Sequence, residues 1–422
     1  MGSDPLKYAV VTFGCRVNQA DSLVIEDDLR ARGGTAAPPE TAELVVVNTC
    51  SVTASADQAA RQAIRRLARL NPGVRVVVTG CYATRRPDEI AALPNVVRIV
   101  RNTAKDALVD EAAADLGLTT AERFGAGEGA CGSTLEPGVA GRTALTLRVQ
   151  TGCEEQCSYC IIPQTRGPGR SRPVARVLAD VERAVAAGYK EIAITGVHLG
   201  SYGRDLHDGA SLTTLVSSLA AVREDVLFRV SSLEPMDCTP EMVDLLAASP
   251  RLAPHVHLPL QHGADEVLRA MRRPYTVSYY RHLVDRIRAV LPHAAIGSDI
   301  VVGFPGETPA QFDEMRRVLE ALSLTHLHVF PYSDRPGTEA SRLQPKVDGR
   351  VVRERAREVR AISGRMAARF RQSQVGRTLR ALTVDDGLSA VTGNYLKLRL
   401  DVPHARNEWI DVRVTDAMHG VE

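Results

Sequence analysis

Short apolar runs rich in valine recur along the first hundred residues, and each is followed by a segment with helical periodicity. The runs at 7–13, 43–48 and 74–79 are the predicted strands, and 22–34 and 54–70 are the predicted helices. Continuous apolar strands that alternate with helices are typical of a parallel sheet covered by helices. Residues 1–100 therefore predict an open parallel-sheet domain of the α/β class.

The same alternation of strand and helix resumes after residue 142. The candidate strands lie at 144–150, 191–197, 227–233, 255–261, 295–303 and 326–332, separated by helical segments. Six consecutive βα units predict a partial, open (βα)6 barrel over residues 143–345.

Three further segments have patterns of their own. Residues 101–142 include GAGEGACGSTLEPGVAG, whose small residues lack periodicity and predict a linker. Residues 346–374 predict a connecting helix in which intermixed Arg and Glu favour an exposed, salt-bridged surface. Residues 375–422 contain short alternating runs such as LSAVTG and WIDVRV, which predict a small β domain.

Cysteines follow the three predicted strands of the first domain. The strands end as TFGC, VNTC and VTGC, which places Cys15, Cys50 and Cys81 just beyond their carboxyl ends. In an open parallel sheet these ends form one crevice where ligands bind. We therefore expect the three thiols to converge, although they are far apart in the sequence.

A second triplet, TGCEEQCSYC, follows the first strand of the predicted barrel and contains Cys153, Cys157 and Cys160. A structural zinc site normally uses four protein ligands, and no fourth cysteine is nearby. Three thiolates suit a [4Fe–4S] cluster with one iron open to an outside ligand. The spacing alone also leaves a partial zinc site or a ferredoxin-like site open.

Composition narrows the function classes. The chain has 422 residues, eight cysteines, a formal net charge of +2 and only 4% aromatic residues. We expect a cytoplasmic protein, because no signal peptide and no long apolar segment is apparent, and in that compartment cysteines favour metal or redox chemistry over disulfides. The low aromatic content argues against an extended base-stacking platform. The segment TRGPGRSRP offers Arg166, Arg170 and Arg172 as contacts for RNA phosphates, with a solvated surface as the alternative.

Several stretches together resemble the methylthiotransferases, radical S-adenosylmethionine (SAM) enzymes with an additional N-terminal cluster domain. They include GCRVNQADS, VVNTCSVTASAD, NPGVRVVVTGCYA, GCEEQCSYCIIPQTRGPGRSRP, HLPLQHGADEVLRAMRRPYT and SDIVVGFPGET. GCRVNQ, TGVHLGSYG and HVFPYSDRPGT are most similar to the branch that acts on N6-threonylcarbamoyladenosine at position 37 of tRNA.

The resemblance implies a set of cofactors and partners. Cys153, Cys157 and Cys160 would hold the [4Fe–4S] cluster that binds SAM, and Cys15, Cys50 and Cys81 would hold a second [4Fe–4S] cluster. One SAM would supply a methyl group to sulfur, and another would supply the radical that removes hydrogen from adenine C2. The implied partners are a tRNA anticodon stem-loop, a reductant and a sulfur donor, with no membrane. The C-terminal segment occupies the place of the family's small RNA-binding TRAM barrel.

The resemblance also implies a SAM-contacting rim on the radical SAM barrel. Its candidates are Tyr159, Gly196, Ser232, Glu234, Gln261 and Asp299. For each of them, ordinary polarity at a strand end or in a loop is the alternative.

Other interpretations stay open at this point. The substrate is alternatively isopentenyladenosine or ribosomal protein S12, or only one cluster is present, or the chain is a zinc-stabilised RNA-binding protein without catalysis. His255, His257, His326 and His328 alternate on strands, where packed, hydrogen-bonded histidines are expected rather than metal ligands. Cys131 and Cys238 belong to neither triplet and are expected to be unligated, and His262 stands where serine is the more familiar residue.

Overall fold

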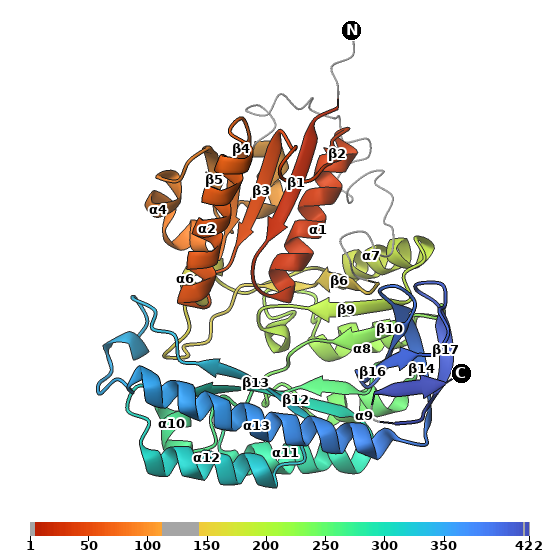
Figure 1. Ribbon diagram of the computed structural model, residues 1–422. Helices are drawn as coiled ribbons and strands as arrows, with labels where there is room; N and C mark the ends of the chain where they lie inside the picture. Colours follow the sequence, from red (N-terminus) through yellow and green to blue (C-terminus); the bar gives the residue numbers. More distant parts are fainter. Residues whose placement is uncertain (1–4, 112–142, 417, 422) are drawn as a thin grey trace.

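The computed structural model describes residues 5–111, 143–416 and 418–421 (Figure 1). Cys131 and most of the predicted linker lie outside these residues. The described chain is an α/β protein with an N-terminal parallel sheet, a central set of βα units and a small C-terminal β-barrel. Among the described residues, no helix is long and apolar enough to cross a membrane.

The N-terminal part is a five-stranded parallel sheet with the order β2-β1-β3-β4-β5. Its elements are β1 (Lys7–Thr12), α1 (Arg16–Ala31), β2 (Thr35–Ala36), β3 (Leu44–Thr49), α2 (Ala54–Leu70), β4 (Arg75–Gly80), α3 (Cys81–Arg85), α4 (Pro87–Ala91), β5 (Val96–Val100) and the 3-10 helix η1 (Lys105–Ala107). All six residues of β3 are buried, because helices cover both faces of the sheet. The predicted strands and helices are confirmed, although α1 begins six residues before the predicted start at residue 22.

Packing continues beyond the last strand of this sheet. Leu108 and Val109, which the sequence placed in the linker, are buried in a cluster with Tyr8 and Leu29. The apolar side chains after η1 therefore complete one face of the N-terminal sheet.

The central part contains six parallel strands in two three-stranded sheets, β10-β9-β6 and β11-β12-β13, joined by a bridge between Phe228 and Leu252. Its strands are β6 (Leu145–Arg148), β9 (Glu191–Thr195), β10 (Leu227–Val230), β11 (His255–His257), β12 (Ala295–Val302) and β13 (His326–Pro331), with a short hairpin of β7 (Gln150–Thr151) and β8 (Arg170–Ser171). Its helical segments are α6 (Ile162–Arg166), α7 (Val174–Ala186), η3 (Leu199–Ser201), α8 (Leu212–Ala220), α9 (Pro240–Ala248), α10 (Asp265–Ala270), α11 (Val277–Val290), α12 (Pro309–Ala321) and η4 (Ala340–Arg342). All six predicted strands are confirmed, and they form the predicted partial barrel.

Helix α13 (Gly349–Gln374) crosses the outside of the barrel beside β13 (Figure 1). Its exposed face is polar, as the sequence predicted, but Val359, Ile362 and Met366 pack into the central core. Arg355 forms a buried ion pair with Glu307, with 2.5 Å between Nη1 and Oε1. The helix is therefore part of the barrel's packing as well as a connector.

The C-terminal segment closes into a small barrel with the order β14-β15-β16-β18-β17. Its strands are β14 (Thr378–Val384), β15 (Ser389–Thr392), β16 (Lys397–Leu400), β17 (Trp409–Val414) and β18 (His419–Val421). The turn between β15 and β16 packs against the central barrel, where the Asn394 side chain donates to the carbonyl of His293 at 3.0 Å. The predicted small β domain is confirmed as a fold.

A buried ionic network joins the N-terminal sheet to the central barrel. Asp21 of α1, 3% exposed, accepts from Lys105 at 2.9 Å, Arg148 at 2.6 Å and Arg166 at 3.1 Å. Burial opposes the charge of Asp21, but the three cations hold the pKa of its carboxyl well below its ordinary value. The network fixes how the carboxyl ends of the two sets of strands face each other.

Candidate functional site

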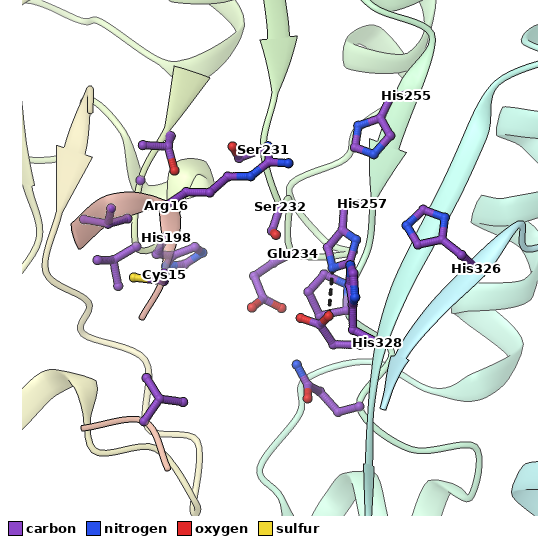
Figure 2. A pocket seen from close by; sticks show the side chains of 18 of the residues that line it. Cys15, Arg16, His198, Ser231, Ser232, Glu234, His255, His257, His326 and His328 are labelled. Carbon is purple, nitrogen blue, oxygen red and sulfur yellow. Dashed lines mark hydrogen bonds and ion pairs between the residues drawn. The ribbon is translucent and has the colours of Figure 1, made fainter. Parts of the chain in front are cut away.

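A cavity of about 780 Å³ lies where strands of the N-terminal sheet and of the central barrel end. Figure 2 shows Cys15 and Arg16 on one side of it, with Glu234 and the histidines across from them. The lining includes all six cysteines of the two triplets: Cys15, Cys50, Cys81, Cys153, Cys157 and Cys160. The structure therefore brings both predicted triplets to a single cavity.

Strand order explains how the dispersed triplet meets. Cys15, Cys50 and Cys81 follow β1, β3 and β4, which are neighbours in the sheet. Gly80 precedes Cys81 with φ +99°, and a Cβ there would lie 2.2 Å from the carbonyl oxygen of Thr49. Glycine is required at this position because both the backbone conformation and the close approach exclude a side chain.

The sequential triplet lies on a loop that backbone and side-chain contacts hold in place. The Gln150 side chain donates to the carbonyl of Gly152 at 2.8 Å and accepts from the amides of Val197 and His198, both at 2.9 Å. The amide of Ser158 donates to the carbonyl of Met271 at 3.1 Å. The loop is thus fastened to the ends of two other βα units.

Burial shapes the chemistry of these thiols. It raises the pKa of Cys50 and of Cys160 to about 12, and neighbouring cysteines of the same triplet raise each pKa further. Burial also raises the pKa of Cys157, while Arg273 acts in the opposite direction. Metal ligation needs thiolates, so binding at either triplet must release protons.

The spacing of the thiols favours a cluster over a single zinc ion. Four thiolates at 2.3 Å from zinc would lie about 3.8 Å apart. In the part of the chain that the structure describes, the one set of three or more potential ligands with donor atoms mutually within 4.8 Å is His257, His326 and His328, and neither cysteine triplet meets this limit. A cubane separates its thiolates more widely, because each binds a different iron. Both triplets therefore fit a [4Fe–4S] cluster better than zinc.

The six residues predicted to contact SAM all line the same cavity: Tyr159, Gly196, Ser232, Glu234, Gln261 and Asp299. Gln261 has φ +69° and its amide donates to the carbonyl of Asp299 at 2.8 Å. Glu234 accepts from Arg273 in a short ion pair, so its carboxylate is already partnered. The Oδ1 atom of Asp299 lies 3.0 Å from Nε2 of His257.

Sequence reasoning missed two charged residues beside the sequential triplet. Arg273 is only 8% exposed and donates from Nη1 to Sγ of Cys157 at 3.0 Å. His198 lies between Asp237, 2.8 Å from its Nε2, and Cys153, 4.0 Å from its Nδ1. Burial disfavours the charge of His198, but these two partners raise its pKa to about 9. The stretch MRRPYT gave no signal that separates Arg273 from its exposed neighbour Arg272.

The three arginines proposed to bind RNA phosphates have different surroundings. Arg166 is 2% exposed and donates to Asp21, Asn18 and Thr151. Its predicted RNA contact is corrected, because a buried guanidinium with these partners has no face left for a phosphate. Arg170 is exposed, and Arg172 is partly buried and paired with Asp180.

The remaining residues singled out in the sequence lie as follows. Cys238 is 1% exposed within the central core, and burial raises its pKa to about 12. His262 is fully buried, accepts from the amide of Ala264 at 3.0 Å and lies 3.5 Å from Glu307. Neither residue lines the cavity. His255, His257, His326 and His328 do line it, on the inner face of the barrel.

Comparisons with known proteins agree with this arrangement. The model of Uncharacterized protein family UPF0004 matches residues 7–101, and that of the Radical SAM superfamily matches residues 147–319. The chain is 36% identical over 368 residues to the threonylcarbamoyladenosine tRNA methylthiotransferase MtaB of Bacillus subtilis, which covers 85% of this chain and 80% of that protein.

Two further comparisons bear on substrate and fold. The chain is 33% identical over 393 residues to the tRNA-2-methylthio-N(6)-dimethylallyladenosine synthase of Streptomyces viridosporus, covering 90% of this chain and 76% of that protein. Its fold is similar to that of the radical SAM methyltransferase TsrM from Kitasatospora setae, with a TM-score of 0.56, 18% identity, and coverage of 80% of this chain and 74% of that one.

Proposed function

The chain belongs to the family of radical SAM tRNA methylthiotransferases, and we propose that it converts N6-threonylcarbamoyladenosine at position 37 of tRNA to its 2-methylthio derivative. In this proposal it uses two [4Fe–4S] clusters and two molecules of SAM. The observation that carries it is the arrangement of two cysteine triplets around one cavity of about 780 Å³.

Each triplet would hold one cluster. Cys153, Cys157 and Cys160 would bind the first, and Cys15, Cys50 and Cys81 would bind the second. When bound, the clusters and SAM supply the one-electron and sulfur chemistry that reaction at the unactivated C2–H of adenine requires.

The chain's own residues orient and charge the site. The guanidinium of Arg273 donates to Cys157 and pairs with Glu234, which joins the cysteine loop to the end of β10. Gln150 holds that loop against the end of β9. The proposed SAM contacts at Gly196, Ser232 and Gln261 lie on the same rim.

Charge in the cavity favours the threonylcarbamoyl substrate over dimethylallyladenosine. The threonylcarbamoyl group carries a carboxylate, whereas a dimethylallyl group is an apolar hydrocarbon. Arg16 and Arg371 reach the lining, and neither has an acidic partner among the described residues. Arg16 is close enough to His328 to lower its pKa. Cationic side chains stabilise a bound carboxylate and gain nothing from a hydrocarbon.

The number of clusters is tested by iron and acid-labile sulfide per chain after anaerobic reconstitution. Wild type is expected to hold about eight irons, and the triple variant Cys15→Ala/Cys50→Ala/Cys81→Ala about four. The triple variant of Cys153, Cys157 and Cys160 is the matched control and should also retain about four. About four irons in wild type, unchanged when the N-terminal triplet is removed, would eliminate the second cluster.

The substrate is tested by mass spectrometry of tRNA from a deletion strain. The 2-methylthio-N6-threonylcarbamoyladenosine signal should disappear and return when the wild-type gene is restored, while 2-methylthio-isopentenyladenosine stays unchanged. Loss of the isopentenyl derivative instead would assign the dimethylallyl substrate. Loss of neither nucleoside, in a strain without a redundant enzyme, would contradict both assignments.

A further inference from the structure

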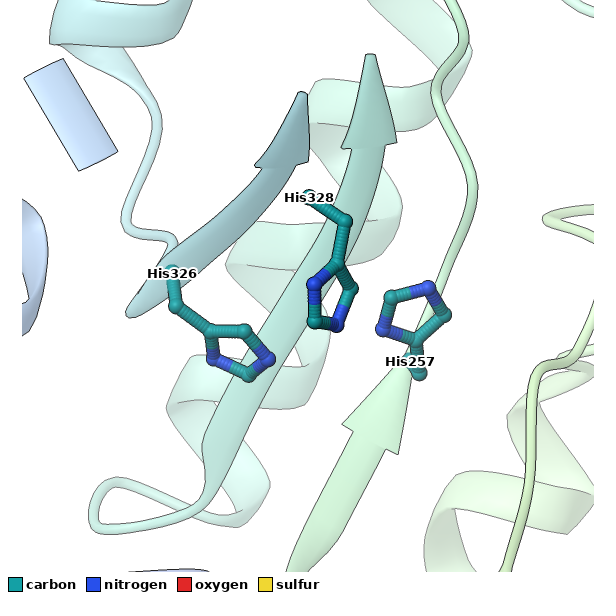
Figure 3. A group of neighbouring side chains, drawn as sticks. All are labelled: His257, His326 and His328. Carbon is teal, nitrogen blue, oxygen red and sulfur yellow. The ribbon is translucent and has the colours of Figure 1, made fainter. Parts of the chain in front are cut away.

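Three histidines converge on the inner face of the barrel, on the side of the cavity away from Cys15 (Figures 2 and 3). His257 ends β11, and His326 and His328 lie on β13, with β12 between them. One ring nitrogen from each lies within 4.8 Å of the other two.

The strand between the histidines has no side chain where their rings meet. Gly297 of β12 is in register with His257 on one side and with His326 on the other. A Cβ at Gly297 would lie 2.4 Å from Nε2 of His326 and 2.8 Å from Nδ1 of His257. The glycine therefore opens a space into which one nitrogen of each ring points.

The other nitrogens of these two rings already have partners. Nε2 of His257 lies 3.0 Å from Oδ1 of Asp299, and Nδ1 of His326 lies 3.0 Å from the hydroxyl of Thr325. Such partners fix the tautomer and orientation of metal-binding imidazoles and leave the opposite nitrogen as the ligand. For both rings, the nitrogen left over is the one that faces the space above Gly297.

The spacing of the rings suits a single metal ion. Ring centroids are 5.3 Å apart for His257 and His328, 5.4 Å for His326 and His328, and 6.3 Å for His257 and His326. Three imidazoles around a tetrahedral ion, with nitrogen ligands at about 2.0–2.1 Å, place their centroids about 5 Å apart.

We propose that His257, His326 and His328 bind one divalent transition-metal ion of the zinc type, separate from the iron held by the cysteines. Imidazole ligands suit zinc, copper, iron and nickel, and three of them leave a fourth position open. That position faces the cavity, because His328 is exposed there while His257 is buried on the barrel wall. With Arg16 nearby, the open position suits water or an anionic oxygen ligand. The site does not depend on which modified adenosine is the substrate.

Zinc stoichiometry of the cluster-loaded protein tests this site. Full-length protein without a polyhistidine tag is reconstituted with iron and sulfide, equilibrated anaerobically with Zn²⁺ and desalted, and zinc and iron per chain are then measured. About one zinc per chain is expected for wild type and for His282→Ala, an exposed histidine on α11 that serves as control. His326→Ala/His328→Ala should lose this zinc and keep its iron.

A milder variant and a spectrum protect the test against misfolding and against zinc on cysteine. His328→Gln removes a cavity-facing ligand without disturbing the core and should weaken zinc binding at least tenfold. X-ray absorption at the zinc edge should show nitrogen and oxygen ligands at about 2.0–2.1 Å and no sulfur at about 2.3 Å. Zinc content equal in wild type and the double variant, a shell containing sulfur, or no bound zinc in wild type would each overturn the proposal.

Discussion

The substitution Asp21→Asn removes the one carboxylate that three cations share between the N-terminal sheet and the barrel. Asp21 has no exposed side-chain area, and the side chains of Lys105, Arg148 and Arg166 are 3%, 15% and 2% exposed. Removing one member of a buried ionic group costs about 3–5 kcal/mol, because the remaining charges stay buried without compensation. With an unfolding entropy of about 2.1 cal/mol/K per residue, this corresponds to a fall in Tm of about 3–6 °C if all 422 residues unfold together.

The effect should depend on pH in a defined direction. Because the pKa of Asp21 is lowered in the folded protein, its contribution to stability is fully present above the pKa of an unfolded Asp, about 4, and is lost as pH falls through the folded pKa. The difference in unfolding free energy between wild type and Asp21→Asn should be constant from about pH 5 to pH 8 and should narrow below about pH 4.

Differential scanning calorimetry at several pH values measures both effects, and Asp106→Asn is the matched control. Asp106 pairs with the same Arg148, but its side chain is 59% exposed, so its loss should cost at most about 1 kcal/mol. If Asp21→Asn lowers Tm no more than Asp106→Asn does, the network does not hold the two parts together and the reasoning is refuted.

Three further predictions concern the cavity. Gly80→Ala should lose about half of the iron, because a Cβ there collides with backbone beside the N-terminal triplet, whereas Gly73→Ala, where a Cβ meets open space, should retain all of it. Arg273→Met removes a charged donor to Cys157 and should make the midpoint potential of the iron more negative in an EPR-monitored titration; an unchanged potential would contradict this role. Arg170→Ala should weaken tRNA binding and reduce the slope of log K against log salt by about 1, and an unchanged slope would remove Arg170 from the RNA contacts.

Strand-end rules were enough to predict that the dispersed cysteines meet. Cys15, Cys50 and Cys81 follow valine-rich runs whose burial and parallel pairing are local properties of the sequence. Cys153, Cys157 and Cys160 needed only their spacing. In both cases the ligands lie next to elements that the hydrophobic pattern defines, so the prediction required no knowledge of how the two parts of the chain dock.

Contacts between distant loops were beyond that reasoning. Arg166 lies in an Arg-rich segment typical of a surface, yet it is buried because Asp21, far away in the sequence, supplies its counter-charge. The histidines were expected to be packed, and the sequence could not show that Gly297 lies in register between His257 and His326. Register between strands is set by tertiary packing, not by the alternation of residues within one strand.

The position of Asp21 links the two triplets as well as the two sheets. Its partner Arg166 also donates to Thr151, two residues before Cys153. Its partner Lys105 also donates to Asn48, two residues before Cys50, at 3.0 Å. A carboxylate that orients both cations therefore supports the chain on either side of the cavity. Asp21→Asn should for this reason loosen iron at both triplets together, whereas Gly80→Ala acts on the N-terminal triplet alone.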